Sequence, residues 1–366
     1  MKPEPFRIDP IFSERIWGSH SLAPLFPNKA NLLAPIGEAW LTGLDCRIAT
    51  GIYSGKTLRE AWHQMSPEWR GSNFTESSDF PLLVKFIFPN DKLSIQVHPD
   101  DAYAAAHEKA AGGRGKTEMW HAVSAEPGAQ VLVGLKPGVN KEKFLESLAS
   151  NTLENLFQPR AVHAGDTFFL PAGTPHTIGP KMILCEVQQY SDLTYRVYDY
   201  GRLDAHGKPR ELHIEKALDV MHFSYTKGGK VAALALNSPP RKTRRTAKPY
   251  SPDRPAEHKV KLLCACPYFA AERLEFSDRL EFPADPEHFQ LLIILNGRGN
   301  LGWPDSAARY NPAECWLLPA SLDLAAMHPL QPTTLLRTYV PNLPSLRQHL
   351  QAAGLSPTAI SQSLFP

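Results

Sequence analysis

Short runs of apolar residues, bounded by proline, glycine and polar turns, recur along most of the chain and predict a protein built mainly from β-strands. Residues 81–101 contain two such runs on either side of a Pro-Asn-Asp turn. Residues 117–123 alternate between two faces, as the next strand would, and residues 260–340 return to the same strand-rich pattern. We therefore expect sheets in both halves of the chain.

Other segments have the pattern of short helices. Pro67 interrupts the first of them, which closes at a glycine, and an aspartate, either Asp100 or Asp101, caps the alanine-rich second one. The first, residues 56–71, is expected to be part of the scaffold. The expected helical insertions are residues 100–112, 140–157 and 211–223.

The stretch from Gly165 to His176, GDTFFLPAGTPH, combines a strand with a rigid corner. A glycine turn opens it and a buried strand follows. Residues 171–175 then force an irregular corner that ends at His176. A histidine held in this way either completes the core or binds a ligand, and taken alone the structural role is favoured.

Further polar residues on apolar strands are candidate partners for His176. Ser94, Gln96 and His98 project from one face of the run after the turn, and Glu118 lies in the following strand. Each has a plain alternative, which is a solvent-wetted face for Gln96 and His98 and an exposed edge for Glu118. Together, two imidazoles, a carboxylate and an amide oxygen form a site that suits zinc and leaves room for water or another ligand.

Charge and composition exclude several classes of protein. The chain has 39 basic and 37 acidic residues, and its net charge of +2 provides no basic footprint for nucleic acid. No apolar run reaches the ~20 residues that cross a bilayer. The cysteines are odd in number and no secretory signal is recognisable, so we expect a cytoplasmic protein. Cys264 and Cys266 fit strand positions better than a metal pair, because no second pair completes a four-ligand site.

A possible linker and an internal echo predict the domain organisation. The expected linker or loop is proline-rich, basic and without periodicity. Residues 312–322, PAECWLLPASL, repeat the pattern of residues 164–174, AGDTFFLPAGT, with Leu324 opposite His176. This echo suggests a repeated fold in which the metal residue has been replaced. The expected first domain, linker and second domain are residues 1–237, 238–259 and 260–366.

The runs KFIFPNDKLSIQVHPDD, GKTEMW and GDTFFLPAGTPH, preceded by GEAW, resemble those of type I mannose-6-phosphate isomerases, which are zinc-dependent enzymes of the cupin superfamily. The resemblance covers roughly residues 6–225. It implies two cupin-like (jelly-roll) β-barrels with helical insertions, the first catalytic with one zinc ion per chain and the second degenerate and metal-free. The implied zinc ligands are Gln96, His98, Glu118 and His176.

The same resemblance implies an activity and roles for further residues. Members of the family interconvert mannose 6-phosphate and fructose 6-phosphate through an enediol. Glu186 is the implied base, and Arg196 would stabilise the enediolate or hold the phosphate. Lys116, a further catalytic candidate, and Lys85 match lysines near the substrate, and Ser94 matches a serine at the phosphate. The alternatives are a structural ion pair for Glu186 and, for Lys85, a packed stem whose head extends to water.

The implied partner is a small sugar phosphate, with no nucleic acid and no membrane, and we expect a monomer or a weak homo-oligomer. Two other functions stay open at this point. One is a cupin regulator that binds sugar phosphates without turnover, and the other is an iron-dependent cupin oxygenase. The fold cannot choose among the three, because barrels of this kind host many reactions.

Overall fold

The computed structural model of the chain describes residues 2–366 apart from 76–77, 205–206, 224–227, 237–257 and 305. Almost all of the expected linker, residues 238–259, lies outside the described residues. The chain forms two compact units, each made of separate segments. The first unit comprises Pro10–Cys46 and Phe80–Val231, and the second comprises Met1–Asp9, Arg47–Asp79 and Ala232–Pro366.

The compact units differ from the expected contiguous domain 1–237 in three segments. Residues 1–9, 47–79 and those from 232 onward belong to the second unit, because the strand and helices of the first two segments pack with residues of the C-terminal part of the chain. Phe6, for example, lies opposite Leu317 in an antiparallel strand pair. Sequence reasoning had no signal for this exchange, since pairing between distant segments leaves no local pattern.

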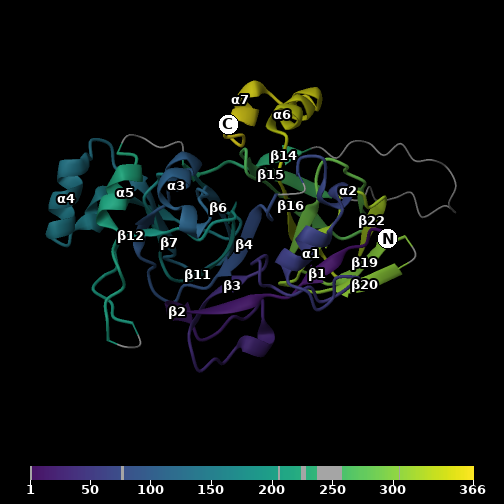
Figure 1. The fold of residues 1–366 in the computed structure, drawn as a ribbon, viewed down its shortest axis with the longest axis horizontal. Coiled ribbons are helices and arrows are strands. Elements are labelled where there is room, and N and C mark those ends of the chain that lie inside the picture. Colours follow the sequence, from purple (N-terminus) through teal and green to yellow (C-terminus); the bar gives the residue numbers. More distant parts are fainter. Residues whose placement is uncertain (1, 76–77, 205–206, 224–227, 237–257, 305) are drawn as a thin grey trace. The chain divides into compact units, whose positions relative to one another are not determined.

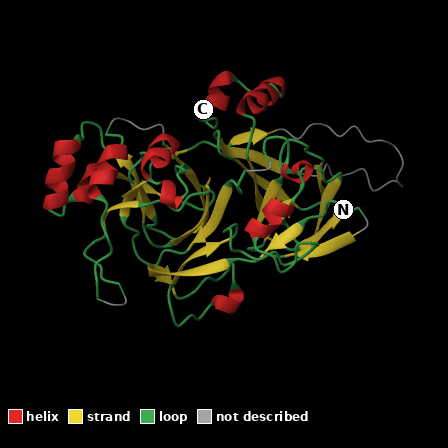
Figure 2. Cartoon of the chain, viewed as in Figure 1, coloured by secondary structure: helices red, strands yellow, loops and turns green. Residues whose placement is uncertain are grey.

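Two antiparallel sheets form the first unit (Figures 1 and 2). The larger contains, in spatial order, β13 (Gly229–Lys230), β9 (Thr167–Leu170), β6 (Glu118–Ala125), β11 (Met182–Gln189), β4 (Leu82–Ile87), β3 (Ile36–Trp40) and β2 (Ile11–Ser19). The smaller contains β12 (Tyr195–Tyr198), β5 (Ile95–Val97), β10 (His176–Ile178), β7 (Gln130–Leu135) and β8 (Phe157–Ala161).

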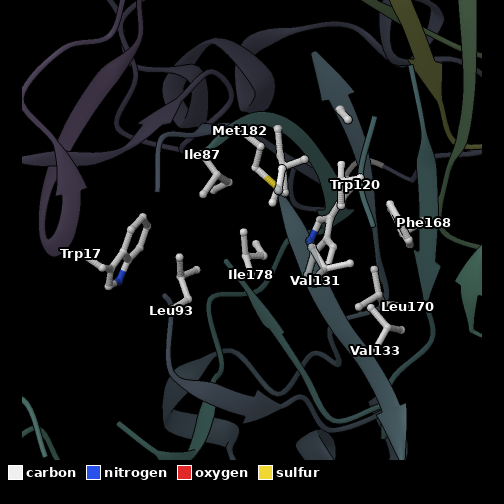
Figure 3. Close-up of a cluster of buried hydrophobic side chains, with 14 residues drawn as sticks. Trp17, Ile87, Leu93, Trp120, Val131, Val133, Phe168, Leu170, Ile178 and Met182 are labelled. Carbon is white, nitrogen blue, oxygen red and sulfur yellow. The ribbon is translucent and has the colours of Figure 1, made fainter. Parts of the chain in front are cut away.

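The core of the first unit lies between these sheets (Figure 3). Trp120 on β6 and Phe168 on β9 come from the larger sheet, while Val131 on β7 and Ile178 on β10 come from the smaller one. All four are at most 2% exposed. Because alternate residues of a strand face the same side, this core fixes which positions of β6 and β11 point inward.

Short helices cover the outer face of the smaller sheet, where Phe144 and Ala217 pack against Ile95 and Val197. Asp100 caps the helix Asp101–His107 by accepting a hydrogen bond from the Tyr103 amide at 2.8 Å. Of the two expected caps, Asp100 and Asp101, it is therefore Asp100 that caps the helix. The expected insertions at 100–112, 140–157 and 211–223 are thus confirmed. The helical elements of this unit are η1 (Pro27–Lys29), α3 (Asp101–His107), η2 (Lys109–Ala111), α4 (Lys141–Ala149), η3 (Leu153–Leu156) and α5 (Ile214–Val220).

The second unit also has two antiparallel sheets with a core between them, to which Leu292 and Trp316 contribute. The larger contains β1 (Phe6–Ile8), β21 (Cys315–Leu318), β18 (Gln290–Asn296), β23 (Thr333–Tyr339), β16 (Ala270–Phe276), β15 (Lys259–Ala265) and β14 (Leu234–Leu236). The smaller contains β17 (Leu280–Pro283), β22 (Leu324–Pro329), β19 (Gly299–Trp303) and β20 (Ser306–Tyr310). The helices are α1 (Leu58–Gln64), α2 (Pro67–Arg70), α6 (Leu343–Ala352) and α7 (Pro357–Ser361).

The two units repeat one strand order. The larger sheet has the order β13-β9-β6-β11-β4-β3-β2 in the first unit and β1-β21-β18-β23-β16-β15-β14 in the second. In the smaller sheets, β5-β10-β7-β8 of the first unit corresponds to β17-β22-β19-β20 of the second. In the register of the sequence echo, Thr167 at the start of β9 matches Cys315 at the start of β21, and His176 at the start of β10 matches Leu324 at the start of β22. The expected repeat and the mainly β fold are therefore confirmed, while closure of each pair of sheets into a barrel stays a prediction.

Two expectations about composition can be compared with the described residues. None of the helices in the described part of the chain has the length and apolar character needed to span a bilayer. Cys264 lies inside β15 and Cys266 follows the strand, and both are buried. The strand interpretation is therefore confirmed for Cys264, while Cys266 lies one residue beyond the strand.

Candidate metal centre

The corner between β9 and β10 places His176 in the interior. Gly173 has φ of +80°, and a Cβ atom there would lie 2.8 Å from the Val220 carbonyl oxygen, so glycine is required on both grounds. Its amide donates a hydrogen bond to the His98 carbonyl at 2.8 Å. The corner is thus attached to the end of the strand that carries the second histidine.

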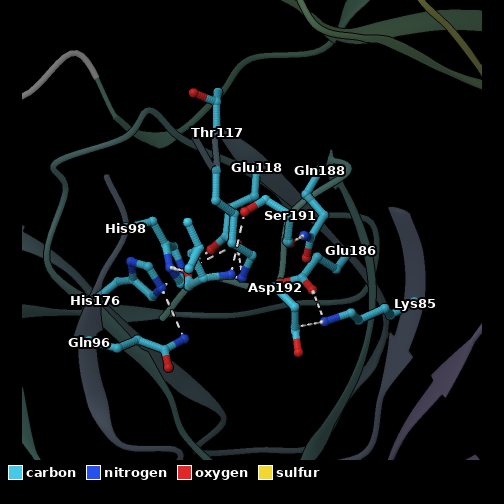
Figure 4. Close-up of polar contacts among 12 residues, drawn as sticks. Lys85, Gln96, His98, Thr117, Glu118, His176, Glu186, Gln188, Ser191 and Asp192 are labelled. Atoms are coloured by element: carbon cyan, nitrogen blue, oxygen red, sulfur yellow. Dashed lines mark hydrogen bonds and ion pairs between the residues drawn. The ribbon is translucent and has the colours of Figure 1, made fainter. Parts of the chain in front are cut away.

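Both imidazoles present the same nitrogen to one point (Figure 4). Nδ1 of His176 donates to the Thr174 carbonyl at 2.8 Å, and Nδ1 of His98 donates to the Leu193 carbonyl at 2.7 Å. A carbonyl only accepts, so Nδ1 carries the proton in each ring and Nε2 keeps its lone pair. Two Nε2 atoms are therefore available as ligands.

Glu118, the first residue of β6, completes a cluster of three. Its carboxylate oxygens lie 3.3 Å from Nε2 of His176 and 3.5 Å from Nε2 of His98, and the ligand atoms all lie within 4.8 Å of one another. Both oxygens are buried; Oε2 forms an ion pair with the Lys116 ammonium at 2.8 Å, while Oε1 has no hydrogen-bond partner among the described residues. A buried carboxylate with an oxygen left unpaired beside two imidazole nitrogens is a donor set that fits a metal ion.

The electrostatic surroundings favour neutral imidazoles and a charged lysine. Burial lowers the pKa of His176 to about 4, and burial together with Lys116 lowers that of His98. Burial also acts to lower the pKa of Lys116, but Glu118 and Glu186 outweigh it and raise that pKa above its usual range. The Lys116 ammonium lies 2.8 Å from Glu118 Oε2 and 3.1 Å from His98 Nε2.

Gln96 is the fourth predicted ligand and lies opposite His176 across β5 and β10. Its Nε2 is 3.3 Å from His176 Nε2, and its Oε1 is 3.5 Å from the Ser94 hydroxyl. A half-turn of the terminal amide would exchange the two ends at almost no steric cost, which would present the oxygen beside the two imidazoles. The geometry thus fits an additional oxygen ligand.

A cavity of about 410 Å³ adjoins the cluster through Gln96 and Lys116. Ser94, Lys85 and Glu186 line it, as do several arginines. The predicted residues from β4, β5, β6, β10, β11 and β12 therefore come together around one place. Such a cavity, lined by five cationic side chains and three carboxylates, is suited to a small anionic molecule.

Glu186 faces into this interior, which settles the orientation that its sequence position left open. On β11 it lies between Lys85 on β4 and Trp120 on β6. Its Oε1 accepts a hydrogen bond from Trp120 Nε1 at 3.1 Å, and its Oε2 lies 3.9 Å from Lys85 Nζ. Burial raises the pKa of Glu186 to about 7, which is the range of a general base at neutral pH.

Lys85 is fully enclosed, so the alternative of a head extended to water is wrong. The residue is 1% exposed, and its ammonium lies 2.9 Å from Asp192 Oδ1. Burial acts to lower the pKa of Lys85, but the carboxylates of Glu38, Asp192 and Glu186 outweigh it and raise that pKa. Lys85 therefore stays charged beside Glu186.

Arg196, on β12, lies opposite Gln96 on β5 and lines the cavity. Its Nη1 donates to the Glu211 carbonyl at 2.9 Å, while its Nε is buried with no hydrogen-bond partner among the described residues. A guanidinium nitrogen left unpaired at a cavity is available to an anionic ligand.

Several lining residues were not predicted individually, among them Arg15, Glu38, Arg210 and His213. Glu38 is the acid of the GEAW run. Its Oε2 forms an ion pair with Nη2 of Arg15 at 2.7 Å. The resemblance in the GEAW run assigned its acid no role, and no motif singled out Arg15, Arg210 or His213. Only the folded chain brings them to the cavity.

The site consists of a buried cluster of two histidines and one carboxylate beside a cation-rich cavity. The chain is therefore a candidate metalloprotein that binds an anionic small molecule in this cavity. The family model for the phosphomannose isomerase type I catalytic domain matches residues 5–125. The mannose-6-phosphate isomerase of Streptococcus mutans is 30% identical over 342 residues, which are 89% of this chain and 98% of that protein. ManA of Bacillus subtilis, also a mannose-6-phosphate isomerase, is 30% identical over 336 residues, 88% of this chain and 95% of that protein.

Solved structures agree with these relatives. The crystal structure of the mannose 6-phosphate isomerase from Bacillus subtilis aligns with a TM-score of 0.78 at 28% identity, covering 91% of this chain and 99% of that one. A zinc-bound mannose 6-phosphate isomerase shares the fold, with a TM-score of 0.67 at 16% identity over 92% of this chain and 99% of that one. The chain belongs to the type I mannose-6-phosphate isomerase family.

Proposed function

We propose that this chain is a zinc-dependent aldose-ketose isomerase that interconverts mannose 6-phosphate and fructose 6-phosphate through an enediol. The observation that carries the proposal is the buried cluster of His98, Glu118 and His176 beside a cavity that contains Glu186. Family membership supports the same reaction. A non-catalytic regulator and an iron-dependent oxygenase are not favoured by the relatives.

Zinc, one ion per chain, fits this donor set. Two neutral imidazoles, a carboxylate and an amide oxygen are borderline-hard ligands without thiolates, and a catalytic zinc site keeps a position open for water or substrate. His98, Glu118 and His176 would hold the ion, with Gln96 as the fourth ligand. When bound, zinc supplies Lewis-acid stabilisation of the oxygen that becomes negative during proton removal.

The protein's own residues supply the proton transfer. Glu186 takes the proton from the carbon next to the carbonyl and returns it to the neighbouring carbon, so that the hydrogen moves between C1 and C2. Lys85 stays charged beside it and holds the carboxylate in place. Lys116, which stays charged as well, faces the oxygens on which charge develops. A positioned base contributes on the order of 100- to 10,000-fold to the rate.

The sugar phosphate is bound by the cation-rich wall of the cavity. Arg196 offers its unpaired Nε, and Ser94 offers a buried hydroxyl, so both are assigned to the substrate and its phosphate. Lys85 and Lys116 add ammonium groups nearby. In this proposal the first unit is catalytic and the second unit has no metal.

A coupled assay with fructose 6-phosphate tests the proposal. The protein is stripped with a chelator, reconstituted with zinc or iron, and its bound metal is measured in the same samples. We expect turnover that returns with zinc. Binding of fructose 6-phosphate to the zinc form without turnover would contradict the isomerase, and oxygen consumption restored only by iron would identify the oxygenase instead. The expected cytoplasmic location and the monomer or weak homo-oligomer stay predictions.

A further inference from the structure

The second unit has a cavity of about 340 Å³ at the strand positions that correspond to the candidate metal centre. The correspondence follows from strand register. Glu118 lies opposite Leu170, and Gln290 lies opposite Leu318, which matches Leu170 in the sequence echo. Gln290 is therefore the counterpart of Glu118.

The cross-strand pair next to this position is reversed in charge. In the first unit Glu186 lies opposite Lys85, and in the second Arg337 lies opposite Glu272 at the same place in the strand order. Arg337 Nε donates to Glu272 Oε2 at 2.9 Å. The second unit thus keeps a buried ion pair beside its cavity, but it has an arginine, Arg337, at the position of Glu186.

The counterparts of His176 and Gln96 are not metal ligands. Leu324, the counterpart of His176, lies opposite Pro283, which is therefore the counterpart of Gln96. Among the described residues, the cluster in the first unit is the one group of three or more metal-ligand side chains that meets at a point. A metal ion is therefore not the ligand that this cavity suits.

Two residues that line the second cavity nevertheless carry buried polar atoms without hydrogen bonds. Gln290, which lines it, is 6% exposed, and its Oε1 is buried with no hydrogen-bond partner among the described residues. His288 lines it too, with Nδ1 held by Asp285 at 3.0 Å and Nε2 buried without a hydrogen bond. Buried groups of this kind cost free energy unless a ligand or water satisfies them.

The charges around the cavity do not favour an anion. No lysine lines it, and Arg337, the one arginine among its described lining residues, is neutralised by Glu272. Asp285 and Glu287 add carboxylates. The cavity therefore differs from the one in the first unit, whose cationic lining complements a phosphate dianion.

We propose that the second unit binds a neutral polyhydroxylated molecule, a sugar or sugar alcohol without a phosphate, in this cavity. Vicinal hydroxyls both donate and accept, so they can satisfy Gln290 Oε1 and His288 Nε2 together. The ring of Tyr339, which lies 5.2 Å from that of His288, and the prolines that line the cavity offer the apolar faces on which C–H groups of a sugar pack.

Titration of the full-length protein with D-sorbitol and D-mannose, followed by saturation-transfer NMR, tests this assignment. Saturating fructose 6-phosphate is present throughout to occupy the first unit. We expect saturable binding with a dissociation constant in the millimolar range. Ser345→Trp, on α6 at the cavity, should weaken it by about tenfold or more, whereas Gln348→Trp, exposed on the same helix and outside the lining, should leave it unchanged.

Gln290→Leu separates loss of binding from loss of folding. Because Oε1 has no partner, an apolar side chain of similar size should leave the melting temperature unchanged or raise it, while sugar binding is lost. Absence of saturable binding by the unmodified protein, or equal weakening by both tryptophan variants, would overturn the proposal. Tighter binding of inorganic phosphate than of sorbitol at this cavity would overturn the assignment to a neutral ligand.

Discussion

At the scale of single residues, the candidate metal centre depends on where two protons are held. Carbonyl oxygens of Thr174 and Leu193 fix Nδ1–H in the two histidines, and so leave both Nε2 atoms for a ligand. Strand alternation placed Gln96 and His98 on one face, while Glu118 joined them only through its chemistry and the family resemblance. The carbonyl partners could not be predicted, because they lie on loops whose course depends on the whole unit.

Replacing Gln96 with alanine should weaken zinc binding by about 10- to 100-fold, since it removes one oxygen ligand but leaves both imidazoles and Glu118 in place. Zinc retained after dialysis against a competing chelator, measured by elemental analysis, reports the change. Gln130→Ala is the matched control, because Gln130 is exposed on β7 of the same sheet. Equal zinc content in the two variants would remove Gln96 from the ligand set.

Glu186 should give the pH profile of kcat/KM an acid limb. The carboxylate is the active form of a base, so activity falls as the pH drops through its pKa. Burial raises the pKa of Glu186 to about 7, and a bound divalent cation opposes that shift, so the limb should lie at or somewhat below about pH 7.

Glu186→Gln tests the same assignment, because the amide keeps the volume and can still accept the hydrogen bond from Trp120. We expect kcat to fall on the order of 100- to 10,000-fold with zinc content unchanged, and the acid limb to disappear from the residual activity. A variant that keeps both its turnover and its acid limb would show that Glu186 is only an ion-pair partner of Lys85.

At the scale of secondary-structure elements, the corner between β9 and β10 shows what a local pattern can predict. Its glycine and prolines indicated a rigid turn ending at His176, and the structure has that turn. The sequence could not show that Val220, at the end of α5, and His222 approach Gly173 closely, because these contacts join segments far apart in the chain.

Gly173→Ala should destabilise the protein by about 1–3 kcal/mol and also lower zinc affinity, because the added methyl strains a left-handed residue and displaces the corner that carries His176. Gly138→Ala is a matched control: Gly138 has the same φ of +80°, but its added Cβ meets nothing within 4 Å. Urea unfolding and zinc content are measured for both. If the two variants lose zinc equally, the close approach at Gly173 has no role in placing the histidine.

At the scale of the whole molecule, one strand order serves two units with different chemistry. The echo between residues 164–174 and 312–322 predicted the repeat, and the loss of a ligand at Leu324 predicted a different role for the second copy. The reversed ion pair of Glu272 and Arg337 was not predicted, because it becomes visible only when strand registers are compared.

The Glu272–Arg337 pair should matter for stability as a pair rather than through either charge alone. Glu272 is 3% exposed and pairs with Arg337, so Glu272→Gln leaves the Arg337 guanidinium without its carboxylate in a buried place. This variant should lose about 3 kcal/mol of unfolding free energy. The double variant Glu272→Gln with Arg337→Met removes both charges and should recover most of that loss, because well-packed apolar groups replace buried ion pairs at little cost. Urea unfolding of the single and double variants measures the difference. A double variant less stable than the single one would mean that the pair itself, and not the avoidance of an isolated charge, holds β16 to β23.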